Sequence, residues 1–406
     1  MLKGKYAFLN LLQKGAVTDL ANNEMITFMV ENPDGLVNAI QLAQNAQLSH
    51  YTITCSNTHK MFGEAPLTEL QRAVSLLNNS ASDFSKSQLR KTASEYRYYP
   101  FPRKVSATFR KIYMSTAKEV NDVRCVAAEI GEILHSRLNG RNTLNNAIHE
   151  YQKWINEFFD YKNTGSINDH TAIGLLKNRS GVCQAIAAVT MLIFPYLGYS
   201  VQYISGEAYG GNSWGPHAWN AIRSNNKWVH VDFTFGMHLL FTPNNDGSMA
   251  NRTFSKTHRW DNNLLSDNML SNSNTIQGRI VRNTVELFVN KNTFFLGDVA
   301  VQTTAPVLVG NDEIGYWIDL HSILPFFEGA CEYLPKSDHL RICLKNRSIL
   351  IDNAKTIIDK STGYIDLRAI RKFADFERES TSPMSLILRW NLSLIHISEP
   401  TRLRCI

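Results

Sequence analysis

The sequence predicts an α+β fold, because helical and strand patterns occupy separate stretches of its middle part. Apolar residues recur at helical spacing in 119–138 and 143–161, and a mostly apolar run over 185–198 suits a buried helix. Residues 217–234 instead read as two short strands joined by polar residues, as in a hairpin. A helix followed by an antiparallel hairpin is an α+β arrangement.

Residues 1–104 are predicted to be an N-terminal α+β segment whose role the sequence does not identify. Residues 35–47 have the pattern of a short amphipathic helix, and residues 51–55 have that of a strand. Residues 75–91 are polar and compatible with a helix, whereas residues 105–113 alternate as a second strand. We therefore place the first domain boundary after residue 104.

The two long helices of the middle part each carry one apolar stripe. The stripes are formed by Val120, Val123, Ala127, Ile130 and Leu134, and by Leu144, Ile148, Tyr151, Ile155 and Phe158. Asn142 or Thr143 is positioned to cap the second helix. Residues 178–181 then form a loop that brings Cys183 to the start of the next helix.

A smaller α+β module is predicted over residues 284–380, which leaves 105–283 as the middle domain. Gly-Tyr-Trp-Ile-Asp-Leu at 315–320 resembles Gly-Tyr-Ile-Asp-Leu at 363–367, and a helix-like segment follows each copy. Residues 340–351 between them have a hairpin pattern.

The remaining residues, 381–406, are expected to be a tail. From residue 393 this tail resembles a translated sequencing adapter, so it is excluded from the predicted fold.

Composition excludes several classes of function. The 406 residues carry a net charge of +6 with no long basic block, and Lys86, Arg90 and Lys91 are expected on a solvated helix face, so we expect no nucleic-acid partner. No apolar stretch reaches the length of about 18 residues that a membrane span needs. The six cysteines are scattered without a CxxC pair or a Cys/His metal spacing, so neither metal nor cofactor is expected.

Cys183 is the candidate nucleophile. It follows Gly181 and Val182 at the expected start of a helix, where the positive end of the helix dipole lowers the pKa of a thiol and favours the thiolate. A cysteine on its own is more often a small buried apolar residue, and that interpretation stays open at this point.

His217 and Asp232 are expected to lie side by side in the hairpin. If Asn225 and Asn226 form a two-residue turn, Asp232 faces Trp219 and His217 is its diagonal neighbour on the same sheet face. Diagonal neighbours are close enough for an Asp–His hydrogen bond. A thiol, a base and a carboxylate that orients the base form the arrangement of thiol acyl-transfer enzymes. The alternative is a histidine that is satisfied within the core.

Other residues near these three have supporting or competing interpretations. Gln184, Trp219 and Asn220 are expected to support the site, Gln184 as a hydrogen-bond donor near the thiol or as a helix cap, and Trp219 through packing. His230 shares the face of Asp232 and is a rival base, although it lies deeper in the strand. His170 has no obvious partner in the sequence.

Residues 171–236 resemble the transglutaminase-like superfamily, with Gly-Val-Cys-Gln, His-Ala-Trp-Asn and Val-Asp-Phe-Thr in that order. The core of that superfamily is papain-like, with a Cys-bearing helix packed on an antiparallel sheet that carries His and Asp. The resemblance implies Cys183 as nucleophile, His217 as base and acid, and Asp232 as the residue that orients it. Thr257-His258-Arg259-Trp260 also resembles a segment that follows the core in bacterial members.

The sequence departs from the family pattern in two places. Many members have a small residue where this chain has Gln184, and the aspartate motif often continues with Trp where this chain has Phe235. Residues 305–377 resemble, more loosely, the copper amine oxidase-like N-terminal domain, an accessory module of bacterial surface proteins. That resemblance implies no copper here.

The resemblance implies an enzyme that transfers an acyl group from a peptide or glutamine amide through a cysteine thioester. Water as acceptor gives a cysteine protease or deamidase, and a lysine amine gives a cross-linking transglutaminase; we expect hydrolysis. The alternative is a catalytically silent binding module of the bacterial cell surface.

Expected partners are a protein or peptide substrate, with a cell-wall polymer or surface protein as a further candidate. The accessory module implies a secreted or cell-envelope location, but the N-terminus has no clear signal peptide.

Overall fold

The computed structural model describes most of the chain. The described residues are 26–56, 58–80, 84–210, 212–224, 227–235, 240–241, 254, 256–260, 284–297, 299–303, 305–311, 315–354, 358, 364–370, 376–382 and 385–391. The predicted adapter at the C-terminus lies outside them, and so do the two expected hairpin-turn residues Asn225 and Asn226.

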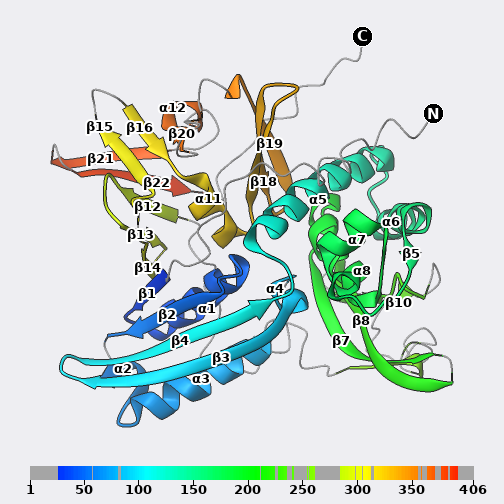
Figure 1. The fold of residues 1–406 in the computed structure, drawn as a ribbon, viewed down its shortest axis with the longest axis horizontal. Coiled ribbons are helices and arrows are strands. Elements are labelled where there is room, and N and C mark those ends of the chain that lie inside the picture. The colour runs from blue at the N-terminus through cyan, green and yellow to red at the C-terminus, as the bar shows by residue number, and fades with distance from the viewer. Residues whose placement is uncertain are drawn as a thin grey trace.

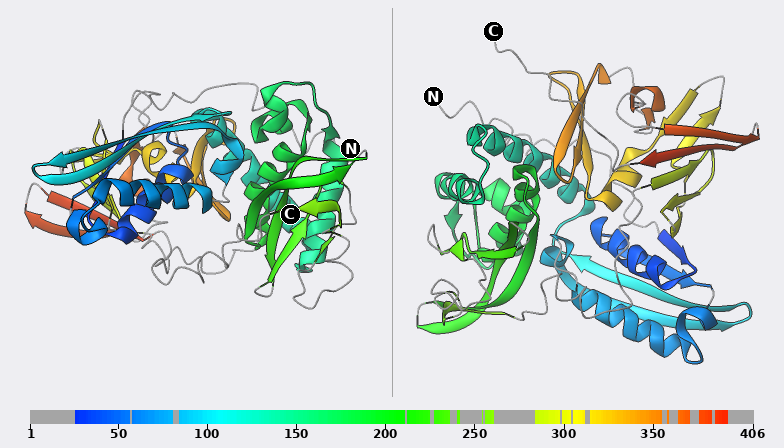
Figure 2. Two further views of the ribbon diagram at one scale, coloured as in Figure 1. Left: turned by 90° about the horizontal axis from the view of Figure 1, so that it is seen from below. Right: turned by 180° about the vertical axis from the view of Figure 1, so that it is seen from behind.

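The described residues form two structural parts (Figures 1 and 2). We call residues 117–260 the central domain. The split domain combines the segments on either side of it, 26–113 and 284–391. A nine-stranded sheet with the order β21-β22-β12-β13-β14-β1-β2-β4-β3 draws its strands from both of these flanking segments.

The N-terminal segment of the split domain alternates strands and helices. Its elements are β1 (Ile26–Val30), α1 (Pro33–Asn45), β2 (His50–Cys55), α2 (Thr58–Phe62), α3 (Pro66–Ser80), α4 (Phe84–Gln88), β3 (Leu89–Pro100) and β4 (Arg103–Tyr113). Asn32 starts α1, because its side-chain oxygen accepts from the Gly35 N–H at 2.8 Å. The helix expected over 75–91 is wrong at its end, since Arg90 and Lys91 lie in strand β3 and not on a helix face.

The C-terminal segment completes the nine-stranded sheet and adds two small three-stranded sheets. Its strands are β12 (Thr284–Phe288), β13 (Thr293–Leu296), β14 (Val299–Gln302), β15 (Leu308–Asn311), β16 (Gly315–Ile318), β17 (Ala330–Leu334), β18 (His339–Leu344), β19 (Arg347–Asp352), β20 (Ile365–Asp366), β21 (Phe376–Ser382) and β22 (Ser385–Asn391). Its helices are α11 (Leu320–Ile323), η5 (Leu324–Phe327) and α12 (Leu367–Ile370).

The expected domain boundaries differ from this arrangement. A boundary after residue 104 cuts through β4, and one after residue 380 cuts through β21. Strand β1 pairs in parallel with β2 and antiparallel with β14, so segments 1–104 and 284–380 do not form separate modules. One apolar core runs through both, and it includes Phe28, Tyr51 and Phe326.

The repeated Ile-Asp-Leu motif forms a paired structure. Ile318 at the end of β16 lies opposite Ile365 in β20, and each copy leads into a short helix, α11 or α12. The hairpin expected over 340–351 is present as β18 and β19.

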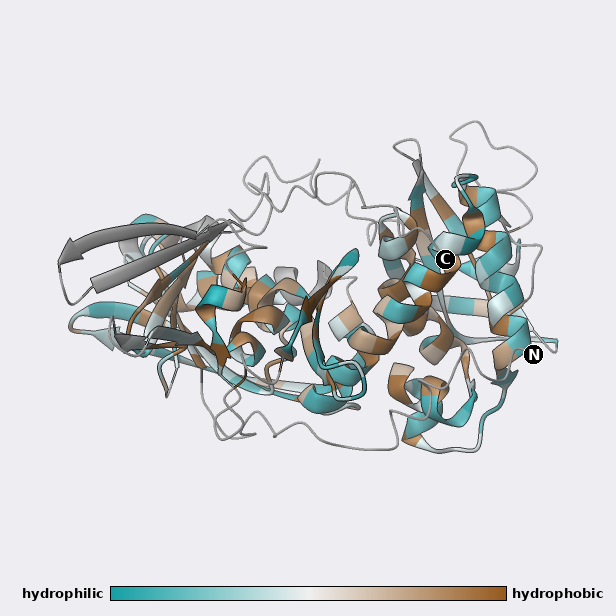
Figure 3. Cartoon of the chain, turned by 90° about the horizontal axis from the view of Figure 1, so that it is seen from above, coloured by the Kyte–Doolittle hydropathy of each residue, from teal (hydrophilic) through white to brown (hydrophobic). Residues whose placement is uncertain are grey.

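The central domain begins with the two predicted amphipathic helices, α5 (Ala117–Leu138) and α6 (Leu144–Phe158). Thr116 and Glu119 form a capping box at the start of α5, and Thr143 caps α6 as predicted. Hydrophilic and hydrophobic segments alternate along the helices of this part in Figure 3, as amphipathic packing requires. Gly131 lets α5 approach Tyr196, because a Cβ there would lie 2.5 Å from the Tyr196 Cβ.

The helix that follows packs on an antiparallel sheet. The short elements β5 (Asp160–Tyr161), η2 (Ile167–His170), α7 (Ala172–Asn178) and β6 (Ser180–Gly181) lead to α8 (Cys183–Ile193) and η3 (Phe194–Leu197). The sheet has the order β10-β9-β8-β7-β11. Its strands are β7 (Val201–Gly210), β8 (Ser213–Ser224), β9 (Lys227–Val231), β10 (Leu240–Phe241) and β11 (His258–Arg259). The predicted α+β class with a papain-like core is confirmed. None of the described helices is long and apolar enough to cross a bilayer.

The shared sheet predicts that the two flanking segments unfold together. Phe28→Ala removes a fully buried ring that contacts Tyr51 and Phe326 edge-on, so the free energy of unfolding should fall by about 3–5 kcal/mol. Denaturant unfolding measures the loss. Met29→Ala is the control, because its side chain is 46% exposed on the same strand and its loss should change little. Limited proteolysis of Phe28→Ala should open residues 26–113 and 284–351 in parallel; cleavage of one segment alone would contradict a shared core.

Candidate active site

Cys183 is the first residue of α8, where the local chain geometry holds it firmly. The Val182 N–H donates to the Asp169 carbonyl at 2.9 Å, and Val182 begins the helix without a side-chain cap. The Asp169 carboxylate in turn accepts from the Thr164 backbone N–H at 2.5 Å and from its hydroxyl at 2.7 Å. These hydrogen bonds hold the loop before α8 in place, and the half-buried Cys183 thiol lies at the helix N-terminus.

The surroundings of Cys183 favour its thiolate. Burial raises the pKa of the thiol, but a hydrogen bond with His217, the charge of that ring and the backbone N–H groups of Ala218 and Gln184 outweigh it, so the pKa is lowered from 9.0. The five described cysteines are all free thiols. Burial instead raises the pKa of Cys55 to about 12, as expected for an unreactive core thiol.

His217 lies on β8 between the thiol and a carboxylate. Its Nε2 lies 2.7 Å from Oδ2 of Asp232, and its ring also hydrogen-bonds Cys183. Burial lowers the pKa of the ring, but the hydrogen bonds and charges of Asp232 and Cys183 dominate and raise it to about 9. Since the pKa of the thiol falls below 9.0 while that of the ring rises, thiolate and imidazolium can coexist.

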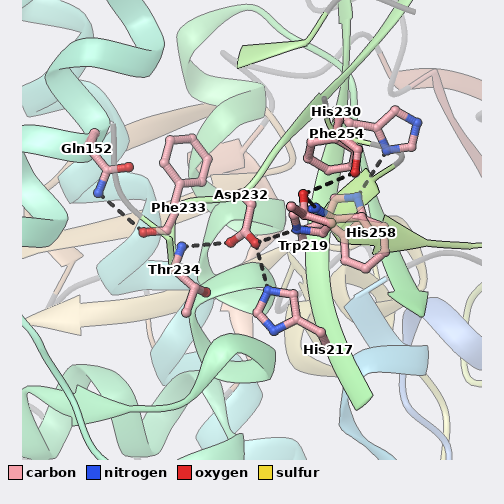
Figure 4. Close-up of polar contacts among 10 residues, drawn as sticks. Gln152, His217, Trp219, His230, Asp232, Phe233, Thr234, Phe254 and His258 are labelled. Atoms are coloured by element: carbon pink, nitrogen blue, oxygen red, sulfur yellow. Dashed lines mark hydrogen bonds and ion pairs between the residues drawn. The ribbon is translucent and has the colours of Figure 1, made fainter. Parts of the chain in front are cut away.

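Asp232 follows the end of β9 and is 1% exposed. Its Oδ1 accepts from the Thr234 N–H at 2.8 Å, and its Oδ2 accepts from two imidazoles, those of His217 and His258 (Figure 4). Burial raises the pKa of this carboxyl, but the two histidine hydrogen bonds overcome that effect and lower it below 3.8. The carboxylate is thus ionised and held at both oxygens.

The predicted hairpin register is confirmed. Ser224 lies opposite Lys227 and Asn220 opposite Val231, which is the pairing that a two-residue turn at 225–226 produces. The alternation along β8 and β9 therefore brings His217 and Asp232 to the same face, as the sequence predicted.

His258 is a further member of the candidate site that the sequence did not identify. Its Nε2 lies 3.0 Å from Asp232 Oδ2, its Nδ1 lies 2.9 Å from the Thr257 hydroxyl, and its side chain is 1% exposed. The ring stacks on Phe254 with centroids 3.9 Å apart. His258 reaches this place because β11 pairs with β7, which is a contact between distant parts of the sequence. The Thr-His-Arg-Trp resemblance marked the segment but gave it no role.

The predicted supporting residues have structural partners. Asn220 Nδ2 donates to the Ala187 carbonyl at 3.0 Å and so ties β8 to α8. The buried Trp219 donates from Nε1 to His230 Nδ1 at 3.0 Å. Burial, with the charge of His258, lowers the pKa of His230 to about 4, so this rival base is a neutral hydrogen-bond acceptor in the core.

Gln184 links the site to the split domain instead of pointing into the reaction centre. Its Nε2 donates to the Ser87 carbonyl at 2.6 Å, and its Oε1 lies 3.3 Å from His170 Nδ1. The expectation that His170 has no partner is therefore wrong. Helix α4, which carries Ser87, therefore contacts helix α8 next to the residue that bears the thiol.

Tyr161 also contacts the nucleophile candidate, and sequence reasoning missed it. Its hydroxyl hydrogen-bonds the backbone N–H and the thiol of Cys183, while its side chain is 59% exposed. Burial and the nearby thiol together raise the pKa of this phenol. Parallel pairing of β5 with β6, directly before Cys183, sets this position.

Three ligand atoms of the site could also hold a metal ion. The ring nitrogens of His217 and His258 and a carboxylate oxygen of Asp232 lie within 4.8 Å of one another. The sequence predicted no metal, and its spacing rules overlooked this group because His258 is distant from the other two. The nitrogen–oxygen distances of 2.7 and 3.0 Å are those of shared protons, and a metal would remove the proton by which Asp232 orients His217.

The charge arrangement predicts the pH dependence of thiol reactivity. Alkylation of Cys183 by iodoacetamide should follow a titration with a midpoint below 9.0, since the thiolate forms while His217 is still protonated. His217→Ala should move the midpoint upward, because burial then acts without the opposing imidazolium. Stopped-time alkylation with peptide mass analysis measures both values. Equal midpoints in the two proteins would rule out the thiolate–imidazolium pair.

The hydrogen bond between His258 and Asp232 predicts different effects for two variants of His258. His258→Ala removes one of two N–H donors to Asp232 Oδ2 and should lower kcat/KM on any substrate turned over by about tenfold. His258→Gln keeps an N–H donor near the Nε2 position and should retain most of the rate. If both variants lose activity equally, the ring acts through packing on Phe254 and not through the hydrogen bond.

Comparison with known proteins finds a family match in the middle of the chain. Residues 134–233 match the family model of the transglutaminase-like superfamily, a range that includes Cys183, His217 and Asp232 but not His258. No curated protein matches the chain.

Two solved structures are similar over part of the chain. One is a candidate cysteine protease from Cytophaga hutchinsonii, with 13% identity and a TM-score of 0.24 over 38% of this chain and 69% of that one. The other is described as a TGase, with 11% identity and a TM-score of 0.23 over 57% of this chain and 64% of that one. At such scores these likenesses add nothing about function. The comparisons give no support to the accessory-module resemblance, which stays a prediction. The similarity to the transglutaminase-like superfamily thus rests on the family-model match over residues 134–233, about a quarter of the chain.

Proposed function

We propose that the protein is a thiol-dependent acyl-transfer enzyme that cleaves amide bonds through a thioester on Cys183. The observation that carries this proposal is the continuous hydrogen-bonded series from the thiol through His217 to Asp232, with 2.7 Å between ring and carboxylate. A silent binding module would have no need of a buried ionised carboxylate aligned behind an imidazole that faces a thiol.

The proposed first step forms the thioester. The Cys183 sulfur attacks the carbonyl carbon of the substrate amide, and the carbonyl oxygen takes the negative charge. Backbone N–H groups at the start of α8 stabilise that oxygen. The Tyr161 hydroxyl, which hydrogen-bonds the Cys183 N–H, lies beside them. The C–N bond then breaks, and His217 gives its proton to the departing amine.

The second step returns the enzyme to its starting state. His217, now neutral, takes a proton from the acceptor, which attacks the thioester carbonyl, and the sulfur leaves as thiolate. The new bond is to oxygen if the acceptor is water and to nitrogen if it is a primary amine. Asp232 holds the His217 ring in the same orientation in both steps, because hydrogen bonds fix both of its carboxylate oxygens.

We propose water as the acceptor and a peptide or glutamine side-chain amide as the donor. The thiol is only half-buried and its neighbours are open to solvent, since Tyr161 is 59% exposed and Phe235 is 49% exposed. The Phe235 ring centroid lies 5.0 Å from that of His217, so Phe235 offers an apolar wall to the substrate beside the base. Deamidation and peptide hydrolysis use the same thioester.

Cys183→Ala provides the direct test. The variant should lose turnover and also lose labelling by iodoacetamide at mildly acidic pH, whereas the buried thiols of Cys55 and Cys331 label in neither protein. Wild-type protein is incubated with casein, with and without a primary amine, and ammonia release, amine incorporation and backbone cleavage are followed together. Unchanged turnover in Cys183→Ala would remove this residue from the mechanism. Amine incorporation in place of hydrolysis would assign a transamidase.

A further inference from the structure

The hairpin β3–β4 is a long arm at the end of the large sheet. Its strands pair from Leu89 opposite Tyr113 to Pro100 opposite Arg103, so Phe101 and Pro102 form the turn. Strand β3 is the last strand of the sheet and is mostly exposed. The tip of the arm lies at the opposite end of the molecule from the long strands β7 and β8 of the central domain (Figures 1 and 2).

The arm carries as much net charge as the whole chain. Residues 89–113 contain seven Lys or Arg and one Glu, a net charge of +6, and the complete sequence is also +6, so the rest of the chain is balanced. The basic residues are Arg90, Lys91, Arg97, Arg103, Lys104, Arg110 and Lys111. The acid, Glu95, is paired with Arg97 at 2.7 Å. Lys111 is buried over the Tyr51 ring and does not contribute to the exposed set.

The tip of the arm is apolar and exposed. Phe101 is 94% exposed, and Tyr98 and Tyr99 are 44% and 42% exposed. Prolines flank Phe101 on both sides, so the ring stands at the apex of the turn. A large aromatic side chain left in water at the end of a projecting hairpin stabilises nothing within the fold, and such exposure is typical of a binding surface.

We propose that this tip docks onto an anionic phospholipid bilayer. The Phe101 ring at the apex enters the bilayer first, and the basic residues lie behind it along the two strands. Strands rise roughly 3.3 Å per residue, so Arg103 and Lys104 lie on the order of 7 Å behind the apex and Arg97 about twice as far. Interfacial insertion reaches about 5–10 Å into a bilayer, which places Phe101 among the acyl chains and the cations at the lipid phosphates.

Other partners fit the arm less well. A second copy pairing along β3 would bring Arg90, Lys91 and Arg97 of one molecule against those of the other, and such charged edges resist edge-to-edge pairing. A nucleic-acid strand needs cations that track its backbone beside aromatic rings on a face. Here the Phe101 ring lies at the tip and the cations lie behind it. A bilayer surface has the matching order, with acyl chains inside and lipid phosphates outside.

Docking through this tip is independent of the acyl-transfer proposal, because no residue of the arm belongs to the candidate active site. The arrangement tethers the tip of the arm and leaves the central domain, with helix α8, away from that tip (Figure 1).

Co-sedimentation of the full chain with vesicles tests the proposal. Vesicles of phosphatidylcholine with roughly a third phosphatidylglycerol should bind the protein, and vesicles of phosphatidylcholine alone should bind it much more weakly. Phe101→Ser should lower the affinity about tenfold, and Arg103→Gln with Lys104→Gln should lower it to a similar extent. The matched control is Ile112→Ser, an exposed apolar residue at the base of the same arm, which should leave binding unchanged.

Three results would overturn the proposal. The first is no binding to the charged vesicles by wild-type protein. The second is equal loss with Ile112→Ser and Phe101→Ser. The third is binding that ignores Phe101→Ser and is fully competed by soluble heparin, which would assign a polyanion site and not a membrane site. Circular dichroism of each variant verifies that the fold is retained.

Discussion

The candidate site depends on one buried charge, the carboxylate of Asp232. Burial alone favours its neutral form, yet the backbone N–H of Thr234 and the rings of His217 and His258 hold it ionised. An unpaired charge in such a place would be strongly destabilising, so these donors have to stay in position. That requirement fixes the orientation of His217, which in turn raises the pKa of the ring and lowers that of the Cys183 thiol.

The fold supplies these groups from separate elements that are tied to one another. Helix α8 presents the thiol, and Asn220 binds the helix to strand β8 through the Ala187 carbonyl. Gln184 extends the connection to Ser87 of the split domain. Arg124 of α5 adds two further links, since it donates to the carbonyls of Asn45 at 2.7 Å and Gly329 at 3.3 Å. Both segments of the split domain therefore bind the central domain that carries the site, 26–113 through Asn45 and Ser87 and 284–391 through Gly329.

The sequence predicted those parts of the site that local rules determine. Cys183 begins its helix because an apolar run follows a glycine-containing loop, and the hairpin register follows from a two-residue turn, which brings His217 to Asp232. His258 and Tyr161 were missed because they reach the site through β11–β7 and β5–β6 pairing, and such contacts have no periodic signature.

The domain boundaries were wrong for the same reason. Antiparallel pairing of β1 with β14 joins segments that the whole central domain separates in the sequence. Patterns within 26–113 correctly predicted strand β2 and most of α1, but no pattern there reveals that the sheet continues with residues 284–302.

The most direct measurement of the central claim is the mass of the covalent intermediate. The protein is mixed with p-nitrophenyl acetate, quenched in acid within the first turnover and digested for peptide mass analysis. We expect one acetyl group on the peptide that contains Cys183 and a burst of nitrophenol equal to the enzyme present, with little of either in His217→Ala. Ester consumption with acetyl on another residue, or an unmodified Cys183 peptide throughout the burst, would contradict the central claim.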